Sequence, residues 1–306
     1  MTERQGSSVE RIGVIGDYNL LEALEPSGPG DLFRARDTIR GFTVIIRRLP
    51  EGFVTRGDRS RLEQAVAALS TLSHPNILRL FEIGDDGGRP YLVFEHLKGQ
   101  SLRREMAGRA LGVRRAVRLG MQMADAVEDA HGAGYLHGGL SPDSVIVTAR
   151  ERAKIPAHEL ACRTGFDAST SPPRLVDYSS PEEVAGNPPD ERSDVFSVGA
   201  ILYEMLTAKR PSVRGAALPS ATNPHVGSAL DEVVMRAVAP NPDKRYARAS
   251  ELATELRRID ELLVSSGSGD DEELPLAPAP RRGRAIAVAV VLVTALAVVA
   301  WWLTRG

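Results

Sequence analysis

The stretch that decides the fold is His137-Gly138-Gly139-Leu140-Ser141-Pro142-Asp143-Ser144, which runs directly into Val145-Ile146-Val147. Glycine, serine and proline favour a loop over the first part, and the β-branched residues that follow favour a short strand. Upstream, residues 113–134 predict a helix because apolar side chains recur on one face, at Val117, Met121, Ala124 and Val127. The sequence therefore predicts a long helix that leads into the loop.

Further motifs lie on both sides of this loop. They are Ser73-His74-Pro75-Asn76-Ile77, Tyr178-Ser179-Ser180-Pro181-Glu182, Asp190-Glu191-Arg192-Ser193-Asp194-Val195-Phe196-Ser197-Val198-Gly199 and Asn241-Pro242-Asp243-Lys244-Arg245-Tyr246. Together they resemble the H-P-N-I-V, H-R-D-L-K-P-x-N, Y-x-S-P-E, D-x-R-S-D-I-Y-S-L-G and P-x-x-R motifs of bacterial eukaryotic-like (Hanks-type) Ser/Thr protein kinases. The resemblance covers about residues 18–263.

This resemblance implies an α+β fold, the bilobal protein-kinase fold. It places a small β-rich N-lobe at residues 18–97 and a larger helical C-lobe at residues 98–263, after a flexible leader over residues 1–17. Within the N-lobe we expect strands over residues 18–24 and 42–48.

A helix is also expected over residues 59–72, because Leu62, Val66, Leu69 and Leu72 share one face.

The motifs that are kept have structural roles in this family. By the resemblance, Glu182 and Arg245 are expected to form a buried ion pair that ties the end of the activation segment to the C-lobe. Asp194 is expected to accept backbone N–H bonds from the loop at residues 137–139.

The positions that carry chemistry in the family hold other residues here. In the loop His137 is kept, but Gly139 stands where the catalytic Asp belongs, Ser141 where the Lys belongs and Ser144 where the Asn belongs. Asp143 lies in the family's variable position and is a poor substitute for the base. We therefore expect no catalytic residue, since phosphoryl transfer depends on a placed base and on bound metal.

The nucleotide site is altered in the same way. Ala157 replaces the magnesium-binding Asp, and the next two residues, His158 and Glu159, do not restore a metal site. The segment from Glu25 to Phe33 resembles the family's glycine-rich loop, of which only the third glycine survives, as Gly30. The same segment also fits an ordinary hairpin turn. The positions of this degenerate ATP site are Glu25, Ser27, Gly30, Arg47, Ala65, Phe94, Glu95, Leu97 and Ala157.

Two of these positions have a plain structural alternative. Arg47 stands at the position of the Lys that binds the nucleotide in the family. It is interpreted equally well as a phosphate ligand or as a solvated or salt-bridged strand residue. Phe94 takes the gatekeeper place and reads also as a core side chain. Ala65 replaces the Glu that pairs with the Lys, and Glu63 lies about 200° round the helix from it.

Composition sets outer bounds on function. The 306 residues are 42% hydrophobic and 25% charged, which is ordinary for a globular protein, and a net charge of −2 gives no reason to expect nucleic acid as a partner. The single cysteine, Cys162, excludes an internal disulfide and a cysteine-based zinc cluster. No metal is expected.

The C-terminal part predicts a membrane anchor. Residues 264–284 are rich in Ser, Gly, acidic residues and Pro, which is typical of a disordered linker. Residues 285–303 then contain no charge over nineteen positions, enough for a helix of roughly 28 Å that spans a bilayer core. Arginines at 281, 282 and 284 place the kinase-like body in the cytoplasm of a single-pass membrane protein.

The first hypothesis is thus a membrane-anchored pseudokinase that acts as a scaffold or allosteric partner, with another protein such as an active kinase. Bound ATP and magnesium are disfavoured as cofactors. The alternatives are an active Ser/Thr kinase with atypical residues, or a nucleotide-binding sensor without turnover. Within residues 160–177, four hydroxyl side chains are either plain loop residues or targets of another kinase: Thr164, Ser169, Thr170 and Ser171.

Overall fold

The structure is a computed structural model that describes residues 12–24, 30–52, 56–156, 177–212 and 215–265. The chain divides into two compact units, residues 1–273 and 274–306, and every described residue belongs to the first.

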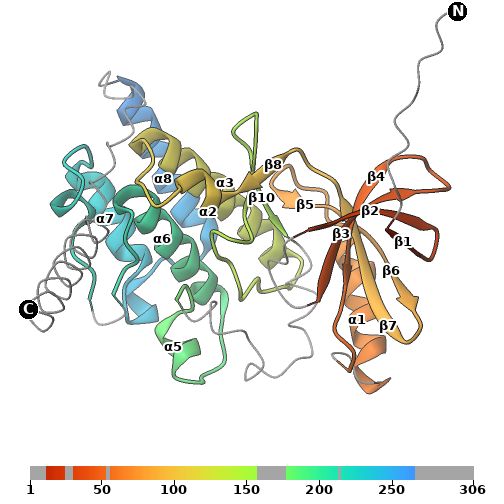
Figure 1. The fold of residues 1–306 in the computed structure, drawn as a ribbon. Coiled ribbons are helices and arrows are strands. Elements are labelled where there is room, and N and C mark those ends of the chain that lie inside the picture. The colour runs from red at the N-terminus through yellow and green to blue at the C-terminus, as the bar shows by residue number, and fades with distance from the viewer. Residues whose placement is uncertain (1–11, 25–29, 53–55, 157–176, 213–214, 266–306) are drawn as a thin grey trace, which may run out of the picture. The chain divides into compact units, whose positions relative to one another are not determined.

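A six-stranded antiparallel sheet forms the N-lobe, with the strands in the order β1-β2-β3-β4-β7-β6 (Figure 1). The strands are β1 (Gly13–Ile15), β2 (Tyr18–Leu24), β3 (Asp31–Asp37), β4 (Thr43–Arg48), β6 (Leu80–Asp86) and β7 (Arg89–Glu95). Because side chains alternate along a strand, Val44 and Ile46 of β4 bury one face of the sheet, and Ile45 and Arg47 lie on the other.

Helix α1 (Arg56–Leu69) covers part of the sheet near β6, as Figure 1 shows. Its expected apolar face is confirmed, because Leu62, Val66 and Leu69 are all buried. The predicted end of the helix was wrong, since Leu72 lies in a turn that follows α1 and its N–H bonds to the carbonyl of Leu69.

The predicted leader was also too long. Residues 13–15 form β1, whose Gly13 and Ile15 pair with Leu20 and Tyr18 of β2. The hairpin turn between the strands uses Gly16 at a φ of 50°, a left-handed conformation that glycine adopts at little cost. A three-residue strand is too short to give an alternating pattern in the sequence, and residues 1–11 lie outside the described part.

The C-lobe holds most of the helices, and a small sheet links it to the N-lobe through β5 (Ile77–Leu78), which lies between α1 and β6 in the chain. The sheet runs β5, β10 (Ala153–Pro156), β9 (Ile146–Thr148) and β8 (Gly99–Ser101), with β5 and β10 parallel. The helices are α2 (Leu102–Met106), α3 (Val113–Gly132), α5 (Pro181–Val184), α6 (Glu191–Thr207), α7 (Ser228–Ala237) and α8 (Ala249–Ser265), with 3-10 turns at Pro219–Ala221 and Pro242–Lys244.

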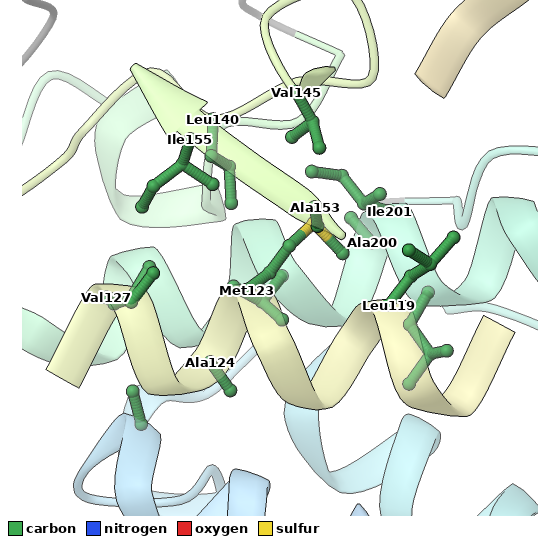
Figure 2. Close-up of a cluster of buried hydrophobic side chains, with 14 of the residues drawn as sticks. Leu119, Met123, Ala124, Val127, Leu140, Val145, Ala153, Ile155, Ala200 and Ile201 are labelled. Atoms are coloured by element: carbon green, nitrogen blue, oxygen red, sulfur yellow. The ribbon is translucent and has the colours of Figure 1, made fainter. Parts of the chain in front are cut away.

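The core of this lobe lies around α3 and α6. Every residue from Ser193 to Thr207 of α6 is buried. Figure 2 shows Leu119 and Met123 of α3 on the side of β10 and α6. Because α3 also packs on α8, its buried surface is wider than one stripe. The predicted stripe was therefore incomplete, since Met123 is fully buried and Met121 only partly.

The predicted linker and anchor fall mostly outside the described residues. Val264 and Ser265 end helix α8, so the linker does not begin at 264 as predicted. Within the part of the chain that the structure describes, no helix has the length and apolar character needed to cross a membrane. The span over residues 285–303 stays a prediction.

The close approach of α6 to α7 gives a test of this packing. A Cβ placed on Gly199 would lie 2.6 Å from the Cβ of Ala237, whereas one on Gly132, also helical, would meet nothing within 4 Å. We expect Gly199→Ala to lower the free energy of unfolding by about 1–3 kcal/mol through overpacking. Gly132→Ala should be neutral or slightly stabilising. Urea unfolding followed by circular dichroism checks both, and equal stability of the two variants would contradict the described packing.

Candidate active site

The carboxylate of Asp194, near the start of α6, organises the loop at residues 137–144. Its Oδ2 accepts the backbone N–H of His137 at 2.7 Å, and its Oδ1 accepts that of Gly138 at 2.6 Å. The Nε2 of His131, from the end of α3, lies 2.8 Å from Oδ2. Burial of Asp194 alone would raise its pKa, but these hydrogen bonds and the two nearby histidines hold that pKa below its ordinary value. The bonds expected from the loop are therefore present.

The two serines of the loop bond to each other. The Ser144 hydroxyl donates to the carbonyl of Ser141 at 3.0 Å and accepts the Ser141 N–H at 3.2 Å. Both residues are buried. Their polar groups thus close a local turn, a common role for serine near backbone groups. Gly138 has a φ of 60°, which suits glycine, and Gly139 brings no functional group to the loop.

Asp143 is engaged beside the loop. Its Oδ2 accepts a bond from the Nε of Arg103 at 3.4 Å, and the Arg103 N–H donates to the carbonyl of Pro142 at 2.9 Å. Arg103 belongs to α2, so the carboxylate of Asp143 is turned toward that helix. The expectation that Asp143 is a poor substitute base stays a prediction.

Sequence reasoning missed a partly buried polar cluster made by Arg103, Tyr178 and Glu204. Arg103 Nη1 donates to Glu204 Oε1 at 2.6 Å and Nη2 donates to the Tyr178 hydroxyl. That hydroxyl donates to Glu204 Oε2 at 2.5 Å. Burial, together with the bond to Glu204, raises the pKa of Tyr178 to about 12. The available signal was Glu204 itself, since a carboxylate inside an apolar helix needs a cation.

The ion pair expected between Glu182 and Arg245 is present and bidentate. Arg245 Nη1 and Nη2 lie 2.7 and 2.8 Å from the two carboxylate oxygens, and the side chain of Arg245 is fully buried. The Ser193 hydroxyl adds a bond to Glu182 Oε1 at 2.7 Å. Burial would raise the pKa of Glu182, but the bonds from Arg245 and Ser193 lower it to about 2.

Arg47 is not solvated, so that part of its structural reading was wrong, while its readings as a salt-bridged strand residue or a phosphate ligand stay predictions. Arg47 is only 2% exposed, and it lies opposite Leu92 in the sheet, two residues along β4 from the pair Ile45 and Phe94. Phe94 is 1% exposed and belongs to the main hydrophobic core, in agreement with its plain structural reading. The alternation of side chains along β4 explains the burial of Arg47, because the odd-numbered residues of this strand face the main hydrophobic core and not water.

Other nucleotide-site positions are placed as follows. Gly30 has a φ of 90°, and a Cβ there would lie 2.1 Å from the carbonyl oxygen of Arg48, so the sheet itself requires glycine. Ala65 lies within α1, while Glu63 is exposed and bonds Arg59 at 3.0 Å. Leu97 is partly buried after β7.

Several predicted positions fall outside the described residues. They are Glu25, Ser27, Ala157, His158, Glu159, Cys162, Thr164, Ser169, Thr170 and Ser171. Among the residues that are described, no group of three or more His, Cys, Asp or Glu side chains could hold a metal ion.

The fold and the loop clamped by Asp194 define a protein of the bilobal kinase fold. Residues 28–260 match the family of the protein kinase domain. The chain therefore belongs to the protein kinase family, as the sequence motifs predicted.

Its relatives include bacterial Ser/Thr kinases. A probable serine/threonine-protein kinase of Streptomyces coelicolor is 27% identical over 265 residues, which cover 79% of this chain and 39% of that protein. The serine/threonine-protein kinase PknE of Mycobacterium bovis is 27% identical over 266 residues, covering 81% of this chain and 47% of the relative. The chain thus spans less than half the length of these two relatives.

Solved structures agree on the fold. The crystal structure of the Mycobacterium tuberculosis PknI kinase domain superposes with a TM-score of 0.66 at 22% identity, covering 83% of this chain and 98% of that one. At this identity the likeness shows the fold alone.

The contribution of the Glu182–Arg245 pair to folding stability can be tested through its dependence on pH. Because the pKa of Glu182 is lowered from 4.5 to about 2 on folding, the ionised pair stabilises the fold above the unfolded value and loses this effect as the pH falls toward about 2. We expect Glu182→Gln to cost about 3–5 kcal/mol at neutral pH by stranding Arg245, and to flatten the acid limb of the stability curve.

The matched control is Asp243→Asn. Asp243 also bonds an arginine, Arg192, at 2.7 Å, but its side chain is 81% exposed, so its loss should change stability by less than about 1 kcal/mol. Denaturant unfolding between pH 3 and pH 7 measures both variants. An unchanged acid limb in Glu182→Gln would remove the pair from its assigned role.

Proposed function

We propose that the chain is a membrane-anchored, catalytically inactive kinase-fold protein that acts as a scaffold or allosteric regulator of another protein, such as an active Ser/Thr kinase. One observation carries the proposal. The loop is held in place by Asp194, while Gly139 brings no functional group to the position of the base and Asp143 is bonded to Arg103. Without a base, a rate loss of about 10²–10⁴ is expected.

The residues present do not fit the ATP and magnesium that the family implies. The hydroxyl of Ser144, at the position of a metal-binding Asn, is used in the turn with Ser141. Arg47, at the position of the Lys, is a buried guanidinium, which differs from an ammonium in shape and hydrogen-bonding directions. The sequence adds Ala157 at the position of the second metal ligand.

The proposals of a membrane anchor and of a protein partner are argued from the sequence. Residues 285–303 have the length and composition of a spanning helix, with arginines before them and two tryptophans near the end. A body whose scaffold contacts are kept while its chemical groups are replaced keeps a folded surface that a partner could bind. This supports a signalling role that depends on binding.

An active kinase is the second candidate, because the relatives carry kinase names. Labelled phosphate from ATP with magnesium, offered to a generic basic protein and to the chain itself, separates the two candidates. We expect no incorporation above background, and no rise in melting temperature when ATP is titrated with or without magnesium.

The control for this assay is Asp143→Ala. Transfer that disappears in this variant would make Asp143 the base and would overturn the inactive assignment. Transfer that persists in it would overturn the assignment too, and would place the base elsewhere. A concentration-dependent melting shift without transfer would instead favour a nucleotide-binding sensor.

Membrane anchoring is tested by fractionation. The full chain should remain in the membrane pellet after a high-salt or alkaline wash, because a spanning helix is held by burial in the lipid and not by charge. A chain that ends at residue 280 should move to the supernatant. A full chain released by the alkaline wash would contradict the anchor.

A further inference from the structure

A half-buried ion pair joins the two lobes. The Nζ of Lys154, in β10, lies 2.8 Å from Oε1 of Glu95, at the end of β7. Nζ also donates to the carbonyl of Ile77 at 3.0 Å. The side chains are 15% and 23% exposed, so this pair is better shielded from water than most surface pairs.

Each partner is fixed to its own lobe. Oε1 of Glu95 accepts the N–H of Arg79 at 2.8 Å, and the Glu95 N–H donates to the Arg79 carbonyl at 3.0 Å, which ties Glu95 to the N-lobe sheet. Lys154 lies between Ala153 and Ile155, which are both fully buried in the main hydrophobic core, and its strand β10 contacts α3 of the C-lobe. Movement of one lobe relative to the other must therefore act on this pair.

Asn76 adds further hydrogen bonds beside this pair. Asn76, which follows α1, donates through Nδ2 to Gln122 Oε1 and to the Ala153 carbonyl, each at 2.8 Å. The Asn76 carbonyl accepts the Ile155 N–H at 2.9 Å. We name Asn76, Lys154 and Glu95 the β10 clasp, in which the Lys154–Glu95 pair supplies the charge.

Opening the lobes would separate charges that are mostly shielded from water. When an ammonium and a carboxylate are separated in a shielded site, the charge-assisted hydrogen bond between them is broken, and such a bond is stronger than a neutral one. The chain crosses between the lobes directly after Glu95, so the pair lies where a hinge motion has to begin.

We propose that the Lys154–Glu95 pair is a conformational clasp that holds the two lobes in one relative orientation and presents them to a partner as a rigid body. This device does not depend on whether the chain transfers phosphate. It goes beyond the inactive scaffold proposed above and stands or falls separately.

Amide hydrogen exchange on the full chain tests the clasp. In Lys154→Met the Ile155 amide, whose bond to Asn76 crosses the lobes, should exchange about tenfold faster, together with the Glu95 amide. The Leu111 amide, which bonds to Met205 within the C-lobe, should keep its rate. Lys154→Arg retains the charge and should stay close to the wild type.

Arg115→Met is the matched control. Arg115 pairs with Glu105 at 2.7 Å at similar exposure, 22% and 20%, but both residues belong to the C-lobe. It should lower stability without a selective effect on Ile155. If Lys154→Met speeds exchange at Ile155 and Leu111 alike, or at neither, the clasp is refuted.

Should Lys154→Met fail to fold, Glu95→Gln replaces it, because the amide keeps an acceptor for Arg79 while removing the charge. Selective exchange at Ile155 in Glu95→Gln supports the clasp. A rate unchanged from the wild type in that variant overturns it.

Discussion

One buried carboxylate, that of Asp194, holds the centre of this fold together. It accepts two consecutive backbone N–H groups of the loop and lies within hydrogen-bond distance of His131 from α3. A charge in such a place is tolerated only when it is fully hydrogen-bonded, so loop, α3 and α6 must be in register for the fold to form. The Glu182–Arg245 pair applies the same constraint at the start of α6, through Ser193.

The interactions that remain are therefore those that support the fold, and the loop keeps its shape by local means. Ser141 and Ser144 close the turn, and Arg103 joins Asp143 to the polar cluster of Tyr178 and Glu204. A loop satisfied within the protein needs no nucleotide or metal to hold it. This is the physical reason for the proposal that the chain acts by binding.

The sequence predicted well where one pattern decides the structure. The apolar face of α1 followed from periodicity, and the Glu182–Arg245 pair followed from the resemblance to the kinase motifs. It predicted poorly where tertiary contacts decide. The burial of Arg47 depends on which face of β4 meets the core, and the full burial of Met123 depends on α3 being covered from several sides. The Arg103 cluster joins residues 75 and 101 positions apart, a contact that no local pattern contains.

The most direct measurement is the exchange rate of the His137 and Gly138 amides in the protein without nucleotide, and again with saturating ATP and magnesium. If Asp194 holds the loop in its final conformation without nucleotide, both amides are strongly protected in the free protein, and their exchange rates do not change when ATP and magnesium are added. Fast exchange in the free protein, with protection gained only when ATP and magnesium are added, would mean that the loop is organised for catalysis and would contradict this account.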